Sequence, residues 1–77
     1  ELLNGQLSNQ LAVALAQRLQ RECGDNADRR IERGFALAVG RAPSPRELEL
    51  SRSFLAEQPL TEFALALFNL NEFLYAP

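Results

Sequence analysis

Few side chains of this 77-residue chain could carry out catalysis or hold a metal ion. The sequence contains no histidine, which is the commonest metal ligand and the usual general base at neutral pH. Carboxylates such as Glu47, Glu49 and Glu72 remain as acid or base candidates, but general acid–base catalysis needs them in a concave, desolvated site. A chain of short helices without His, Lys or Trp gives no reason to expect such a site. We therefore predict no catalytic residue, no cofactor-binding residue and no metal site, and expect that the domain is not an enzyme.

The single cysteine excludes a disulfide within the chain. Cys23 lies one helical turn after Leu19, in line with Ala12 and Ala16, which are apolar. We expect it to be a half-buried small hydrophobic residue at a helix end and not a reactive thiol, because no positive group is placed to activate it.

The charge balance argues against a nucleic-acid partner. Ten acidic residues outnumber eight arginines, giving a net charge of −2, whereas a phosphate-binding domain usually presents a basic face. The densest basic group, Arg29, Arg30 and Arg33, is interrupted by Asp28 and Glu32, which is typical of a solvated helix face with internal ion pairs. The longest apolar run, from Phe63 to Phe68, is far shorter than a membrane span.

The positions of apolar residues predict an all-α fold, a compact bundle of four short helices near residues 8 to 22, 26 to 39, 45 to 57 and 61 to 70, with an irregular end through Tyr75. Asp25 is the expected N-cap of the second helix, and Gly40 the residue that ends it. The third helix has the strongest start signal: Ser44, Pro45 and Glu47 form a capping-box pattern. Both ends of the chain suggest that residues 1–77 are a single domain taken from a larger protein.

The helical projections also predict which side chains form the core. The expected core residues are Leu11, Leu15, Leu19, Ile31, Phe35, Ala38, Leu48, Phe54, Leu55, Phe63, Leu67 and Leu70. The fourth helix differs from the others because apolar residues cover most of its circumference. We expect part of it to remain exposed as an interaction surface, formed by Leu65, Phe68, Phe73 and Tyr75, that contacts other domains of the parent chain or a second copy.

A structural ion pair between Arg41 and Glu72 is a further expectation. Glu72 lies between Leu70 and Phe73 in the most apolar stretch, where a desolvated carboxylate needs a cation or amide donors. Arg41, held between Gly40 and Pro43, is a suitable donor. The alternative is that both side chains lie in solvent, as most charged side chains of a small domain do.

Two motifs resemble a known family. The turn at residues 40–48, Gly-Arg-Ala-Pro-Ser-Pro-Arg-Glu-Leu, and the ending at residues 67–75, Leu-Phe-Asn-Leu-Asn-Glu-Phe-Leu-Tyr, look like the C-terminal part of a domain of unknown function in large planctomycete proteins. The resemblance implies an exported parent protein with a cytochrome-c-like domain elsewhere, and hence an extracytoplasmic (periplasmic or secreted) location. This chain lacks the Cys-x-x-Cys-His motif for haem attachment, so the resemblance transfers no cofactor and no catalytic residue to it.

The same Gly-Arg-x-Pro turn also resembles two other kinds of helical protein. One is the middle, DNA-facing region of bacterial sigma factors, which would make this a DNA-binding unit, although Glu47 and Glu49 would then face the groove. The other is the helical linker type found in secreted and phycobilisome linker proteins. We expect a non-catalytic interaction or structural module that closes the C-terminal end of a larger exported protein, with DNA binding as the alternative.

Overall fold

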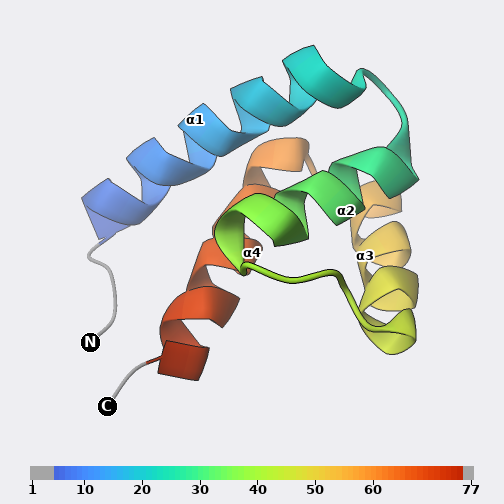
Figure 1. Ribbon diagram of the computed structural model, residues 1–77. Helices are drawn as coiled ribbons and strands as arrows, with labels where there is room; N and C mark the ends of the chain where they lie inside the picture. Colours follow the sequence, from blue (N-terminus) through green and yellow to red (C-terminus); the bar gives the residue numbers. More distant parts are fainter. Residues whose placement is uncertain (1–4, 76–77) are drawn as a thin grey trace.

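The computed structural model describes the backbone of residues 5–75 and the side chains of residues 5–70. Within those residues the chain forms four α-helices and no strand: α1 (Gly5–Cys23), α2 (Ala27–Ala38), α3 (Pro45–Glu57) and α4 (Leu60–Tyr75). The predicted all-α bundle of four helices is confirmed (Figure 1). Helix α1 packs mainly on α4, whereas α2 contacts each of the other three helices. Helix α3 does not pack on α1, and its contact with α4 is limited.

The second helix begins one residue later than the predicted cap. Asn26, not Asp25, is the N-cap of α2: its backbone is extended and its Oδ1 accepts a hydrogen bond of 3.0 Å from the Arg29 amide. Gly24 closes α1 in the left-handed region with a φ of 58°, and the Asn26 amide then donates to the Cys23 carbonyl at 3.2 Å. This turn places Asp25 outside the helix, so the next residue with a suitable side chain forms the cap.

The signals around the third helix act as predicted. Gly40, with a φ of 83°, follows α2, and its amide donates to the Phe35 carbonyl at 2.9 Å. The Ser44 hydroxyl accepts from the Glu47 amide at 3.1 Å, and the Ser44 amide donates to Glu47 Oε1 at 2.8 Å. Both halves of the capping box are therefore present, with Pro45 in the first turn where its missing N–H costs no helical hydrogen bond.

The fourth helix is longer than predicted at both ends. It begins at Leu60, where the Pro59 carbonyl accepts from the amides of Glu62 and Phe63, and it continues to Tyr75 without the expected irregular end. Asparagines at 69 and 71 do not stop it, because one Asn costs a helix less than about 1 kcal/mol, while burial of an apolar side chain contributes about 1.5–3 kcal/mol. Leu70, which lies between them, packs against the core.

The core contains the expected residues together with several smaller ones. Of the predicted set, Leu15, Leu19, Ile31, Phe35, Ala38, Phe63 and Leu67 are buried, and Leu11, Leu48, Phe54, Leu55 and Leu70 are half-buried. The unpredicted members are mostly small: Ala12, Ala16, Cys23, Val39 and Ala64. Alanines contribute little to a hydrophobic stripe in the sequence. They are nevertheless buried where two helix axes come close, because small side chains at a contact allow a short distance between the axes.

Gly34 marks the closest approach between α2 and α4. It is buried within α2, and a methyl group added there would lie 2.8 Å from Leu67 Cδ1 and 3.3 Å from Phe63 Cε2 of α4. The absence of a side chain at this position lets the two helices pack directly, which fixes the position of α4 relative to α2 and hence to α3.

Candidate functional site

The carboxylates that could serve in catalysis are used in ion pairs. Glu47 pairs with Arg41, and Glu49 pairs with Arg46 at 2.6 Å on the exposed face of α3. The side chain of Glu72 lies outside the described residues. Among the residues that the structure describes, no group of three His, Cys, Asp or Glu side chains is placed to hold a metal ion. Arginines therefore hold the candidate carboxylates Glu47 and Glu49 in place.

Arg41 makes a two-bond contact with Glu47. Its Nη1 and Nη2 donate to the two carboxylate oxygens of Glu47 at 2.6 and 2.9 Å, and its guanidinium lies 5.8 Å from the centre of the Phe35 ring. The Arg41 guanidinium, followed by the Ser44 amide, lowers the pKa of Glu47 to about 2. The expected pair between Arg41 and Glu72 stays a prediction, because the Glu72 side chain lies beyond those described.

Two further arginines, Arg33 and Arg52, form ion pairs between helices. Arg33 of α2 donates to Glu22 of α1 at 2.9 Å, and Glu22 also accepts from Arg18 at 2.7 Å, as its i, i+4 spacing predicts. These two arginines lower the pKa of Glu22, Arg18 more strongly than Arg33.

A second contact joins α3 to α2. Arg52 donates two hydrogen bonds of 2.8 Å to Asp28, and these bonds lower the pKa of that carboxyl. Asp28 and Arg33 of the Arg29 to Arg33 face therefore pair with neighbouring helices, whereas the sequence predicted pairs within the face.

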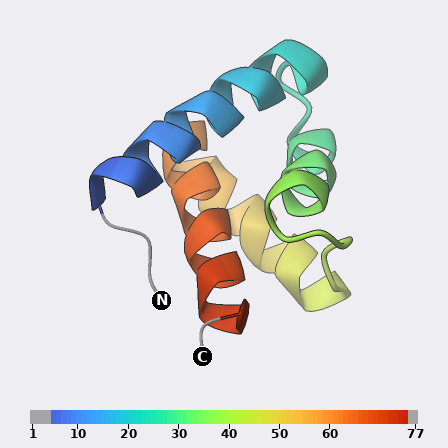
Figure 2. The same ribbon diagram turned by 60° about the vertical axis from the view of Figure 1, so that its left-hand side comes forward.

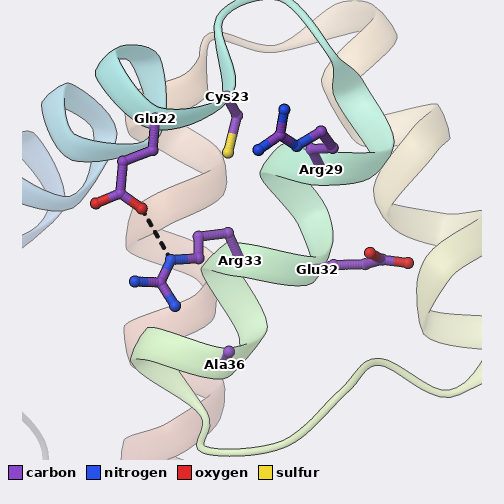
Figure 3. A pocket seen from close by; sticks show the side chains of 6 residues that line it. All are labelled: Glu22, Cys23, Arg29, Glu32, Arg33 and Ala36. Carbon is purple, nitrogen blue, oxygen red and sulfur yellow. Dashed lines mark hydrogen bonds and ion pairs between the residues drawn. The ribbon is translucent and has the colours of Figure 1, made fainter.

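A polar hollow lies where the end of α1 faces α2. It has a volume of about 310 Å³ and is lined by Glu22, Cys23, Arg29, Glu32, Arg33 and Ala36 (Figure 3). Glu22 and Arg33 pair across it, and Cys23 is buried rather than half-buried. Because Cys23 is only 8% exposed, the access of reagents to its thiol is limited.

An apolar groove between α3 and α4 is a second concave feature. It has a volume of about 340 Å³, and its lining consists of Phe35, Glu47, Leu50, Ser51, Phe54, Phe63, Ala66, Leu67 and Leu70. Helices α3 and α4 diverge from the turn that connects them (Figure 2), and Phe35 of α2 contributes to the lining between them. At the wide end, the Arg41–Glu47 pair borders the groove. We call this feature the α3–α4 groove.

Apolar side chains of the α3–α4 groove remain open to solvent. Leu50 is 51% exposed, although it belongs to the apolar face of α3, and Phe54 and Leu70 are half-buried. The Phe54 and Phe63 rings meet across the groove with their centroids 6.2 Å apart and tilted by 49°. Such an arrangement provides apolar contact area and pre-packed aromatic walls, which are features of binding sites for apolar groups.

The sequence did not single out this groove. The expected interface residues Leu65 and Phe68 are half-buried against the core, while the side chains of Phe73 and Tyr75 lie outside the described residues, so that surface stays a prediction. Leu50 is the residue that could have pointed to the groove. It lies at the margin of the apolar stripe of α3, where it is buried only if another element packs over it.

No helix that the structure describes is both long and apolar enough to cross a membrane. Comparison with known proteins finds no matching family, no matching curated protein and no matching solved structure.

Proposed function

We propose that this domain is a non-catalytic interaction module that holds a partner in the α3–α4 groove. The proposal is supported by the apolar lining of the groove, in which Leu50 is exposed and Phe54 and Leu70 are only half-buried. Apolar surface that is concave, contiguous and rimmed by polar residues is typical of interaction sites, whereas single exposed apolar residues are common and need no explanation.

Docking there has a clear physical driving force. Each Å² of apolar surface removed from water contributes about 25 cal/mol, and the groove is formed before the partner arrives because Gly34 and the capping box fix its walls. Binding of a partner therefore costs little conformational entropy on the side of the groove.

The resemblance to the planctomycete segment supports a particular setting for this module. In that setting the partner is a neighbouring domain of a larger exported protein, and the helical module closes the C-terminal end of that protein in an extracytoplasmic compartment. The motifs at residues 40–48 and 67–75 are what supports this part of the proposal.

The DNA-binding alternative gains no support from the side-chain arrangement. Six of the arginines make ion pairs with carboxylates: Arg18, Arg30, Arg33, Arg41, Arg46 and Arg52. A phosphate-binding surface would need several of these cations to be available together. Retention on a heparin column at low salt would favour DNA binding over the interaction module.

Site-specific photo-crosslinking in the cells that make the protein tests the proposal. A photo-reactive amino acid at position 50 is compared with the same amino acid at position 13, because Leu50 and Val13 are similarly exposed apolar residues, 51% and 45%, but only Leu50 lines the α3–α4 groove. We expect a discrete adduct from position 50, either within the parent chain or with another protein, and none from position 13. No adduct from position 50, or the same adducts from both positions, would contradict the proposal.

A further inference from the structure

Two carboxylates that do not line the α3–α4 groove, Glu57 and Glu62, flank the turn from which its two helices diverge. Glu57 follows Leu50 by seven residues and Phe54 by three, so it lies on the groove side of α3. Glu62 precedes Ala66 by four residues, so it lies along the same side of α4. Both are exposed, and no hydrogen bond or ion pair of either side chain occurs among the described residues.

The other carboxylates of α3 and α4 whose side chains the structure describes are paired with arginines. Glu47 at the wide end is held by Arg41, and Glu49 on α3 is held by Arg46. Among the described residues of α3 and α4, the uncompensated charge beside the groove is therefore negative and lies at the turn between these helices, while Arg21 of α1 lies next to Leu60 and Thr61 on the other side of that turn. The carboxyl end of α3 and the amino end of α4 meet at this turn, so their opposite dipole ends offset each other and the net charge comes from the two carboxylates.

The walls of the groove favour a helical occupant. They are the side-chain surfaces of two helices, whose backbone groups are already bonded within each helix, and no sheet edge is present in the described chain for an extended peptide to pair with. An extended segment would leave its own N–H and C=O groups without partners against Leu50, Phe54 and Leu70. A helix satisfies these groups internally and offers an apolar stripe, as in known helix-in-groove recognition.

We infer that the partner segment is a basic amphipathic helix. Its apolar residues, spaced three and four apart, enter the α3–α4 groove, and its Lys or Arg side chains face Glu57 and Glu62. This inference rests on the proposed function and adds the chemistry of the partner to it. Complementary charge at the rim selects the partner and speeds association, while the apolar contacts hold it.

Selection from a displayed peptide library tests the inference. The library consists of helical peptides with a fixed stripe of leucines and with Lys, Arg, Glu, Asp, Gln or Ser allowed at the flanking positions, and the isolated domain is the bait. We expect peptides that bind the domain, lose binding to the Leu50→Glu variant and keep it to Val13→Glu. Among them, Lys and Arg should be enriched over Asp and Glu at the positions beside the stripe.

Charge variants then test the role of the two carboxylates. A selected basic peptide should bind about tenfold more tightly than its charge-reversed counterpart at low salt, with the preference shrinking as salt rises. Glu57→Gln and Glu62→Gln should each reduce the preference, and the double variant should nearly abolish it. Glu32→Gln removes an exposed carboxylate from α2, away from the groove, and should leave the preference unchanged.

The outcomes separate this inference from the proposed function. Peptides that depend on Leu50 but show no basic preference, or an acidic one, would overturn the basic partner and leave the groove as a docking site. If no peptide depends on Leu50, the docking groove itself is contradicted. Self-association that depends on Leu50, or selection of peptides that bind without forming a helix, would overturn the inference in favour of a second copy or an extended ligand.

Discussion

Arg41 and Glu47 lie six residues apart and meet through two parallel hydrogen bonds, Nη1 to Oε1 at 2.6 Å and Nη2 to Oε2 at 2.9 Å. The same Oε1 accepts from the Ser44 amide, so one carboxylate both caps α3 and anchors the turn that precedes it. Because Arg41 also lies over Phe35, this contact ties the turn to α2 and sets the wide end of the α3–α4 groove.

Glu47→Gln should destabilise the domain at neutral pH and lose its effect in acid. The pKa of Glu47 is lowered from 4.5 to about 2 in the folded chain, so its contribution is complete above pH 4.5 and is lost as the pH falls towards 2. After discounting for the partial exposure of both side chains, we expect a loss of about 1 kcal/mol at pH 7. Urea unfolding at pH 7 and near pH 2.5 measures both values.

Glu49→Gln is the matched control, since Glu49 lies on the same helix but pairs with Arg46 in an exposed position. We expect it to change the stability by less than about 0.5 kcal/mol at either pH. Equal effects of the two substitutions at neutral pH would show that the contact of Glu47 with Arg41 and Ser44 has no special stabilising role.

Gly34→Val should disturb the contact between α2 and α4. Even a methyl group at this position would lie 2.8 Å from Leu67 Cδ1, and Leu67 is itself buried, so there is little room for it to move. Overpacking of this kind costs about 1–3 kcal/mol. Ala36→Val, two residues along the same helix at an exposed position, should cost only the helix propensity of valine, below about 1 kcal/mol. Thermal unfolding followed by circular dichroism compares the two, and a Gly34→Val domain as stable as Ala36→Val would contradict the close packing.

Leu19→Ala should be among the most damaging single substitutions. Leu19 is fully buried between the helices, and truncation of a buried leucine to alanine costs about 2–5 kcal/mol because a cavity remains. A domain of this size has a total stability of only about 4–12 kcal/mol, so the variant should unfold at a much lower urea concentration. Val13→Ala, at an exposed position on the same helix, should change the midpoint little, and a similar small change for Leu19→Ala would mean that α1 is not central to the core.

The fold could be predicted from the sequence where local chemistry decides it. Ser44, Pro45 and Glu47 determine the start of α3 by themselves, because the hydrogen bonds of a capping box form within one turn of helix. The cap of α2 was wrong by one residue, since Asp25 and Asn26 have similar capping preferences and the choice depends on how the turn after Gly24 closes.

Features that depend on tertiary packing could not be predicted in the same way. Ala12, Ala16 and Ala64 are buried because helices come close at those positions, which a hydrophobic stripe does not reveal. The excess of apolar residues on α4 indicated an uncovered surface, but the position of the α3–α4 groove follows from the divergence of two helices that α2 holds apart. The sequence indicated that Glu47 caps α3. It did not reveal that the Glu47 carboxylate also accepts two hydrogen bonds from Arg41.

Binding of a neutral, solvatochromic apolar dye to the isolated domain shows whether the α3–α4 groove is open and apolar in solution. Wild-type protein, Leu50→Glu and Val13→Glu are compared by dye fluorescence at equal concentration, after circular dichroism has shown that all three are folded. We expect a blue-shifted, saturable signal from wild-type and Val13→Glu protein and the loss of this signal in Leu50→Glu. No saturable signal from the wild-type domain, or an equal signal from all three proteins, would contradict this expectation.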